Sequence, residues 1–317
     1  MKTKTCIFAI LLAVGLITSR AQDTWTQKAD FGGVARLYAV GFSIGSKGYI
    51  GTGTLGGDGG LNDFWEYDPA NDTWTQKADV PVEREQAVGF SIAGKGYIGT
   101  GGNDFFLNDF WEYNPASNSW RQKADVPGGR ILAVGFSIGS KGYIGTGSLG
   151  GGGVNDFWEY DPANDTWTQK ANVGPTGRYQ AVGFAIGEKG YIGTGIVFSF
   201  GVKDFWEYDP ANDTWTQKAD FGGTPRGGAV GFSIGGKGYI GTGGFIYSPP
   251  MLKRISGNMT LLPMPGRRKP TLGEEHEAMQ SGSVSVERGI LERVGMRLPS
   301  MRISGNILPR LAADLRW

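Results

Sequence analysis

The chain has 317 residues, and its 55 Gly, 10 Trp, 12 Tyr and 17 Phe indicate short strands and many turns. The 31 Lys and Arg residues nearly balance the 30 Asp and Glu residues, so no global field attracts nucleic acid or an anionic membrane. A single His and a single Cys exclude most histidine proton shuttles, cysteine zinc sites and disulfide networks, and we expect no cofactor. The composition therefore favours a repetitive β protein over an enzyme.

Residues 1–21 have the pattern of a secretory signal peptide. Lys2 and Lys4 precede an apolar run from Cys6 to Ile17, and Ser19-Arg20-Ala21 has the small-x-small pattern of a cleavage site. The apolar run is too short for a membrane-spanning helix, which needs ~20 residues. We expect cleavage after Ala21 and an exported bacterial protein, in the periplasm, at the cell surface or secreted, without a membrane span.

Residues 22–250 repeat one unit every 46 to 49 residues. The phrase GYIGTG begins at Gly48, Gly96, Gly142, Gly190 and Gly238, and DFWEY begins at Asp63, Asp109, Asp156 and Asp204. Each unit contains four strand-like runs, AVGFSI, GYIGTG, DFWEYD and TWTQKA, which we name runs a, b, c and d. Tight turns join run a to run b and run c to run d, so each unit is predicted to be a four-stranded antiparallel meander.

The order of these motifs resembles the kelch family: a Gly-rich run b, a variable loop, DFWEYDP, a Trp on run d and an Arg before the next unit. The resemblance covers about residues 23–244 and implies an all-β fold, a β-propeller of four-stranded antiparallel blades. Only Gly101-Gly102 and Gly243-Gly244 keep the Gly-Gly doublet that kelch repeats usually carry. About five blades are present, which predicts an incomplete ring. The lone run d at residues 23–29 resembles the strand with which kelch propellers complete their last blade.

Residues 251–317 depart from the repeat and hold 11 Lys and Arg against 6 Asp and Glu. The pentapeptide RISGN nevertheless occurs at Arg254 and Arg302, which are 48 residues apart, one repeat period. Reading the codons of KDFWEYDP one base late permits RISGNMTL, and the single Trp codon then gives Gly, as at Gly257. This segment is therefore predicted to be repeat DNA read out of frame, a tail that is largely disordered or irregular, and the parent protein is predicted to have six blades. We expect residues 238–243 to keep an unpaired edge.

The b–c loops and the d–a stretches differ between units, whereas the a–b and c–d turns are nearly constant. In an antiparallel meander the b–c and d–a connections emerge at the same edge, so the variation is predicted to fall on one face. One Arg per unit precedes run a, and two differing residues follow it. The candidate ligand-binding residues on this face are Arg36, Tyr38, Arg84, Arg130, Arg178, Tyr179 and Arg226.

A ring of guanidinium groups at a channel mouth would suit a carboxylate or another anionic ligand. The alternative is that each Arg pairs with an acidic residue of a neighbouring blade or with a backbone carbonyl. Asp63, Glu66 and their counterparts recur in every unit, so we expect them to pair structurally with residues such as Lys77. No catalytic residue and no metal site is predicted.

Three hypotheses about function remain at this point. The first is an exported binding or interaction module that takes a protein or glycan ligand on the variable face, with no nucleic-acid partner. The second is an enzyme acting on an anionic sugar, of the sialic-acid-processing type. It would need an acid, base or nucleophile outside the repeat, for which Glu83, Glu85 and Tyr179 are isolated candidates. The third is a purely structural surface protein.

Overall fold

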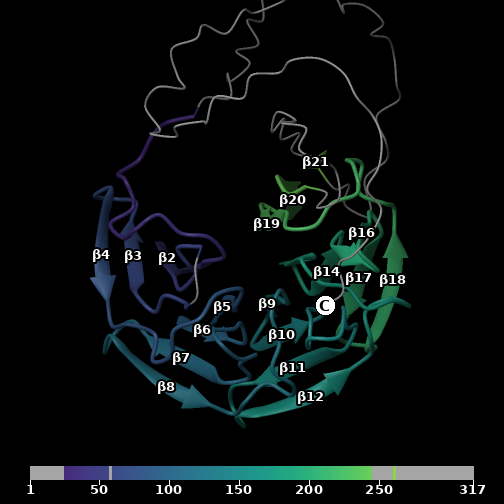
Figure 1. The fold of residues 1–317 in the computed structure, drawn as a ribbon, viewed down its shortest axis with the longest axis horizontal. Coiled ribbons are helices and arrows are strands. Elements are labelled where there is room, and N and C mark those ends of the chain that lie inside the picture. The colour runs from purple at the N-terminus through teal and green to yellow at the C-terminus, as the bar shows by residue number, and fades with distance from the viewer. Residues whose placement is uncertain (1–24, 57–58, 245–259, 262–317) are drawn as a thin grey trace, which may run out of the picture. The chain divides into compact units, whose positions relative to one another are not determined.

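The computed structural model describes residues 25–56, 59–244 and 260–261, which all belong to the compact unit of residues 1–266. This described part is all-β, and its sheets are arranged as the blades of an incomplete β-propeller (Figure 1). No helix in these ranges is long and apolar enough to cross a membrane. The signal-peptide prediction and most of residues 251–317 lie outside the described residues.

Four blades are complete and have their strands in chain order. Blade 1 contains β1 (Val40–Ile44), β2 (Lys47–Gly51), β3 (Phe64–Asp68) and β4 (Thr73–Lys77). Blade 2 contains β5 (Val88–Ile92), β6 (Lys95–Gly99), β7 (Phe110–Asn114) and β8 (Ser119–Lys123). Blade 3 contains β9 (Val134–Ile138), β10 (Lys141–Gly145), β11 (Phe157–Asp161) and β12 (Thr166–Lys170). Blade 4 contains β13 (Val182–Ile186), β14 (Lys189–Gly193), β17 (Phe205–Asp209) and β18 (Thr214–Lys218), with the small hairpin β15 (Ile196–Val197) and β16 (Phe200–Gly201) in its b–c loop.

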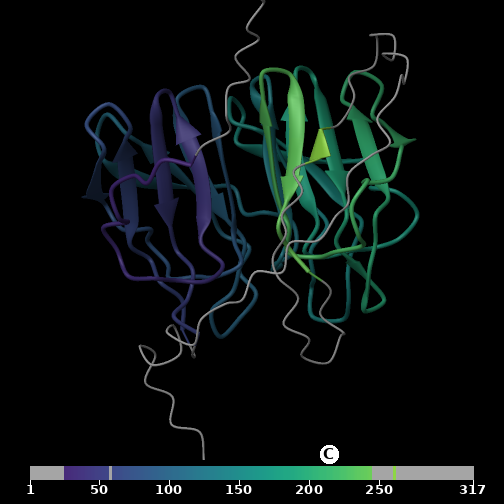
Figure 2. The same ribbon diagram turned by 90° about the horizontal axis from the view of Figure 1, so that it is seen from above.

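The tight turns predicted from the sequence hold each meander in register. In blade 1, Asp68 accepts hydrogen bonds from the Ala70 amide at 2.9 Å and from Asn71 Nδ2 at 2.7 Å, which closes the c–d turn. Lys47 Nζ lies 2.5 Å from Asp68 Oδ2, and this contact is the main reason why the pKa of Asp68 falls to about 2. Such turns lie at one end of the strands and the other connections lie at the opposite end, so the strands run between two layers of loops (Figure 2).

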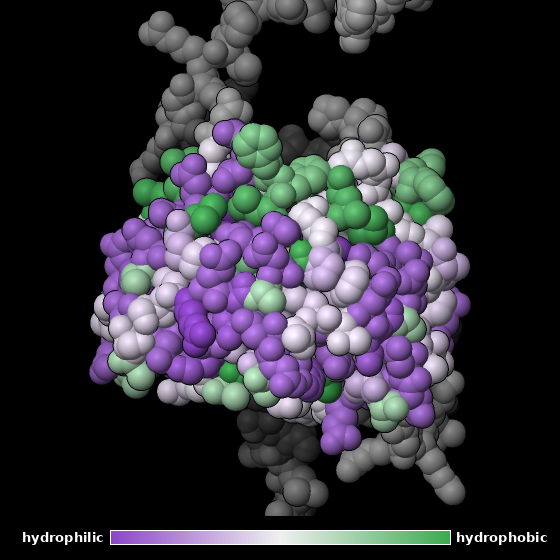
Figure 3. All heavy atoms as spheres, turned by 90° about the horizontal axis from the view of Figure 1, so that it is seen from below, coloured by the Kyte–Doolittle hydropathy of each residue, from purple (hydrophilic) through white to green (hydrophobic). Residues whose placement is uncertain are grey.

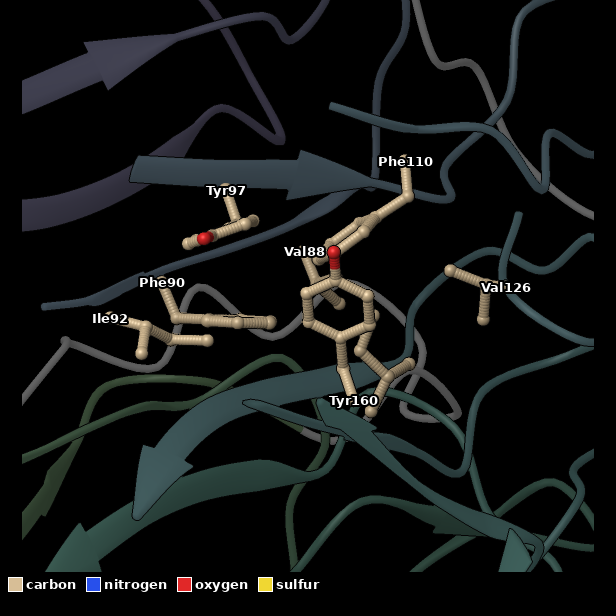
Figure 4. Packing of buried hydrophobic residues seen from close by; sticks show 8 residues of the cluster. Val88, Phe90, Ile92, Tyr97, Phe110, Val126 and Tyr160 are labelled. Atoms are coloured by element: carbon tan, nitrogen blue, oxygen red, sulfur yellow. The ribbon is translucent and has the colours of Figure 1, made fainter. Parts of the chain in front are cut away.

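The core lies between neighbouring blades rather than inside one sheet. Phe110 of blade 2 packs edge-on against Tyr160 of blade 3, with ring centroids 4.9 Å apart, and both side chains are fully buried. Figure 4 shows the ring of Tyr160 among the apolar side chains of blade 2. Phe90 of blade 2 lies over Gly142 of blade 3, where an added Cβ would come within 2.6 Å of the Phe90 ring. The glycines of each blade thus provide the surface on which the aromatic residues of the preceding blade pack.

A clamp links the end of the d strand to the following blade in blades 1 to 3. The Ala78 amide donates to Asn118 Oδ1 at 2.9 Å, and Trp120 Nε1 donates to the Ala78 carbonyl at 2.8 Å. The same pair of bonds recurs at Ala124 and Ala171. These bonds join consecutive blades by main-chain contacts as well as by the aromatic core.

The N-terminal segment occupies the position of a closing strand without forming one. Asp72 Oδ1 accepts from the Ala29 amide at 3.0 Å, and Trp74 Nε1 donates to the Ala29 carbonyl at 3.2 Å, so Ala29 is clamped by blade 1 as Ala78 is clamped by blade 2. The prediction of a d strand at residues 23–29 is nevertheless wrong for residues 25–29, which lie in no strand. A strand needs a hydrogen-bonded neighbour, and no third strand of a closing blade is among the described residues.

Blade 5 contains β19 (Val230–Ile234), β20 (Lys237–Gly241) and the two-residue strand β21 (Thr260–Leu261). The expected unpaired edge of β20 is therefore partly covered, because Tyr239 pairs with Leu261 and Ile240 pairs with Thr260. In blade 4 the equivalent Ile192 pairs with a Trp, a residue that the shifted frame would place at position 257. The pairing that replaces the lost third strand is thus short and differs in register.

Candidate functional site

The two kinds of variable loop lie side by side at one edge of the blades. Within each blade, an isolated antiparallel bridge joins the residue after the conserved Arg to the start of the b–c loop. These bridges are Leu37 to Thr54, Glu85 to Gly102, Ile131 to Ser148, Tyr179 to Ile196 and Gly227 to Gly244. The amide of Gly53 also donates to the Arg84 carbonyl of the next blade at 2.9 Å, a link that recurs along the blades. The variable segments therefore form one continuous face, which we call the loop face.

A chain of main-chain hydrogen bonds runs across the loop face from blade to blade. It joins the second residue after each Arg: Gln86 N donates to Tyr38 O, Leu132 N to Gln86 O, Gln180 N to Leu132 O and Gly228 N to Gln180 O, at 3.0 to 3.2 Å. All five residues have positive φ, between 54° and 64°. Left-handed backbone is costly for Tyr, Leu and Gln, so the neighbouring loops must hold this geometry in place. The side chains at these five positions differ, whereas the backbone link does not.

Three of the candidate arginines lie beneath the loop face and are fully buried, namely Arg84, Arg130 and Arg178. The guanidinium of Arg130 donates to both carboxylate oxygens of Asp156 at 2.7 Å and to the Thr146 carbonyl at 3.2 Å. Arg84 and Arg178 make the same contacts with Asp109 and Asp204. These groups present no free donor at the surface. The structure thus matches the alternative of pairing with an acidic residue, but the acid belongs to the same blade.

The arginine of blade 1 is held in the same way, whereas that of blade 5 is held differently. The Arg36 guanidinium makes the bidentate contact with Asp63, at 2.5 and 2.6 Å, with its side chain 4% exposed. Arg226 is half-buried and donates to the Thr224 and Thr242 carbonyls, and it has no carboxylate partner among the described residues. Its repeat counterpart of Asp63 would lie in the segment where the reading frame changes.

The electrostatics of the pairs follow from this geometry. Burial raises the pKa of Asp63 and of Asp204. Hydrogen bonds from an arginine and from the indole N–H two residues later lower it by more than burial raises it. The net pKa of both carboxyls lies below the ordinary value, so they stay ionised at neutral pH. The prediction that Asp63 pairs with a lysine of strand d is wrong, because both oxygens of the Asp63 carboxylate accept hydrogen bonds from Arg36. Lys77 pairs with Glu66 instead, at 3.5 Å, as expected for that glutamate.

A small cavity of about 200 Å³ lies along the innermost strands of all five blades. Its lining consists of Ala, Val and Gly residues at the starts of β1, β5, β9, β13 and β19 and just before them. None of these side chains can donate a proton, coordinate a metal or attack a substrate. The lining of the cavity therefore offers no reactive side chain, and the polar and aromatic side chains at this end of the blades belong to the loops.

The loop face exposes large apolar side chains in every complete blade. Exposed residues of the b–c loops are Leu55, Phe105, Phe106, Leu149, Phe198 and Phe200, and those of the first d–a stretch are Val34, Leu37 and Tyr38. Phe198 is 80% exposed and Phe105 is 76% exposed. Figure 3 shows hydrophobic residues gathered along one edge of the visible surface. Apart from Trp25 and three residues of β19, all exposed large hydrophobic residues in the described ranges belong to these loops.

The sequence analysis named Tyr38 and Tyr179 on this face but overlooked the apolar loop residues. Tyr38 is 49% exposed, and Tyr179 is half-buried beside Ile196. The sequence does contain a signal for these residues, because each b–c loop of a complete blade has a Leu or Phe among glycines and polar residues. Solvation alone would favour a polar side chain at such a position. The described residues contain no cluster of His, Cys, Asp and Glu fit for a metal, and no hydrogen bond in them joins Glu83, Glu85 and Tyr179.

The repeated four-stranded antiparallel blades fit a kelch-like β-propeller, incomplete at its fifth blade. Among solved structures, the chain is similar to the one titled "Structure of YjhT", with a TM-score of 0.57 and 19% sequence identity. The similarity covers 66% of this chain and 73% of the other, and it concerns the fold alone. No family model matches the sequence, and no curated protein matches it.

Proposed function

We propose that this protein is an exported binding module that takes a protein partner on its loop face. A propeller-like fold suggests a binding or interaction role, because the blades hold many variable loops rigidly side by side. The single observation that carries the proposal is the set of exposed Leu and Phe side chains in the loops of four consecutive blades. An exposed apolar patch of this kind is typical of a protein interface.

The candidate residues have two roles in this proposal. Tyr38 and Tyr179 contact the partner together with the apolar loop tips, because aromatic side chains dominate the binding energy of many interfaces. Arg36, Arg84, Arg130, Arg178 and Arg226 hold the backbone of the loop face through bonds to carbonyls and, in four blades, to an aspartate. They position the contact residues without touching the partner.

A glycan ligand is the second candidate. The side chains along the main-chain link include Tyr38, Gln86 and Gln180, and aromatic rings with amides suit the apolar faces and hydroxyls of sugars. An enzyme acting on an anionic sugar has less support. The arginines that would hold a carboxylate are bonded within the protein, and the lining of the cavity has no acid or base.

The proposal is tested with the mature chain, a loop variant and a surface control. The loop variant combines Phe105→Ser and Phe198→Ser, and the control is Trp25→Ser, which removes an aromatic residue that is 98% exposed outside the loop face. Each protein is immobilised and exposed to the secreted and surface proteins of the producing cells, and separately to a glycan array. We expect proteins retained by the wild type and the control to be lost from the loop variant.

Retention of the same proteins by all three chains would contradict the proposal. Glycan binding that survives in the loop variant, with no protein retained by the wild type, would favour the second candidate instead.

Export is part of the same proposal and rests on residues 1–21. Mass spectrometry of protein recovered outside the cytoplasm should give a mature N-terminus at Gln22. Recovery of a chain that retains Cys6 would show that the segment is not a cleaved signal peptide.

A further inference from the structure

Successive blades fit together through one repeated contact. Val, Phe and Ile of each innermost strand pack on two glycines of the next blade. An added Cβ at Gly89 would lie 3.0 Å from Phe42, and one at Gly96 would lie 2.7 Å from it. The same close approach recurs at Gly135 and Gly142, at Gly183 and Gly190, and at Gly231. Each blade therefore has a projecting Val-Phe-Ile face on one side and a glycine face on the other.

The projecting face of blade 5 is uncovered. Val230, Phe232 and Ile234 are 57%, 37% and 62% exposed, whereas the equivalent residues of blade 2 are at most 4% exposed. A row of three apolar residues on a regular strand is therefore left in solvent, although the identical row is buried in the other four blades or nearly so.

The glycine face of blade 1 is uncovered in the complementary way. An added Cβ at Gly41 or Gly48 would meet only atoms of blade 1 itself, at 3.7 Å or more. Ile50 and Tyr67 of this face are half-buried, whereas their counterparts in blades 2 to 4 are fully buried. Among the described strands β19 makes no contact with β1, so the two open faces do not cover each other within one chain.

We propose that blade 5 of one chain docks on blade 1 of a second copy of this chain. The open faces are the two halves of a contact that this structure already contains four times, so the new interface continues the existing ones. The occupant is a second copy because only the repeat supplies the paired glycines and the flat strand that the Val-Phe-Ile row needs. In the shifted reading of residues 251–317 that pattern is lost.

The N-terminal segment gives an independent argument for this arrangement. Asp72 and Trp74 hold Ala29 where the end of a preceding blade's fourth strand would lie. Blade 5 has a first, a second and a very short third strand but no fourth among the described residues. Docking would thus place the segment clamped to blade 1 of one copy beside the incomplete sheet of the other. Such an interface joins unlike faces, so it is heterologous and leaves one open face at each end of a pair.

Two substitutions, Gly48→Val and Ile234→Asp, should disrupt the proposed interface without destabilising the fold of a single chain, and two others serve as controls. Gly48→Val adds a β-branched side chain to an open face with room for it, so it should block docking and leave the melting temperature unchanged. Ile234→Asp should block docking from the other side, since this residue is 62% exposed in one chain. The matched control Gly96→Val places the same side chain 2.7 Å from Phe42 and should lower the melting temperature. Phe198→Asp removes an exposed aromatic residue of the loop face and should leave association intact.

The measurement is sedimentation velocity over a wide range of protein concentration, made on the mature full-length chain. We expect the wild type and Phe198→Asp to form species of at least twice the mass of one chain, and Gly48→Val and Ile234→Asp to stay monomeric. An equal mixture of these two variants should form dimers and nothing larger, because each retains the face that the other lacks.

A wild type that is monomeric throughout would overturn the proposal, and so would association that survives in both single variants. A monomer whose melting temperature falls in Ile234→Asp would show that the chain covers this face itself. Gly48→Val leaves the loop face unchanged. A negative result for self-association would therefore not contradict the proposed binding of a partner on the loop face.

Discussion

The aspartate partners of the buried arginines show what a single residue contributes to this molecule. Arg130 is fully enclosed, and its guanidinium bonds to Asp156 and to three carbonyls of the loops around it. Removing one partner of such a pair leaves a charge poorly solvated, which costs more than the pair itself contributes. The arginine thus ties the d–a stretch to the loop that precedes the third strand.

Arg130→Leu should lower the free energy of unfolding by about 3 kcal/mol, because Asp156 loses its partner and several carbonyls lose a donor. Arg226→Leu is the matched control. It stands at the same repeat position but has no carboxylate partner among the described residues, so the loss should stay within about 1 kcal/mol. Urea denaturation of both variants measures the difference. Equal losses would mean that the ion pair is not what stabilises the loop.

At this scale the sequence predicted the positions better than the partners. The arginine of each unit was identified as special, and Glu66 was correctly paired with Lys77. Asp63 was assigned to a lysine because the two lie on strands expected to be neighbours, whereas its true partner, Arg36, lies 27 residues earlier, before the first strand. Loops of variable length separate the two, and periodicity gives no distance across them.

At the scale of elements, the clamp at the end of the fourth strand in blades 1 to 3 explains why the N-terminal segment is held at all. Residues 25–29 have no strand partner in the described part of the chain, yet Ala29 makes both bonds that Ala78, Ala124 and Ala171 make. The sequence predicted this segment as a strand from its TWTQKA motif. A strand conformation depends on a neighbour that the motif cannot provide, so the segment is held at Ala29 without forming a strand.

Asp72→Ala should release this segment selectively. The carboxylate accepts the Ala29 amide at 3.0 Å, so its removal leaves that amide open to exchange. Hydrogen exchange should show faster exchange at Ala29 and unchanged protection at Ala124 and Ala171, whose clamps use other aspartates. Faster exchange at all three alanines would indicate general loosening and would argue against a local clamp.

For the whole molecule, the fold class could be predicted from the sequence because the pattern of one four-stranded meander recurs several times along the chain. The all-β architecture with four complete blades and a partial fifth is confirmed. The short strand β21 was not foreseen, since it pairs residues of the shifted segment that have no repeat motif. The sequence shows that each b–c loop of a complete blade contains a Leu or Phe, but the exposure of these side chains depends on the loop conformation, which periodicity does not give.

Restoring the reading frame near codon 251 should produce a more stable protein with a sharper thermal transition. The repaired chain would supply the remaining strands of blade 5 and three strands of a sixth blade, so the rows at Val230–Ile234 and at Gly41 and Gly48 would both be covered. Burying each large apolar side chain contributes roughly 1.5 to 3 kcal/mol. Calorimetry of both chains measures the effect. An original chain that melts as high and as cooperatively, with residues 251–317 protected from protease, would contradict the expectation that this segment leaves the fold incomplete.

The main-chain link across the loop face has a consequence for how such a protein can change. The bonds run in turn from Tyr38 to Gln86, Leu132, Gln180 and Gly228, and they use only backbone amides and carbonyls. A change of side chain at any of these positions that keeps the backbone amide therefore alters the loop face and leaves the bonds between blades in place. The repeated units can thus differ at this position one at a time, and a side chain that tolerates positive φ needs no compensating change in the rest of its blade.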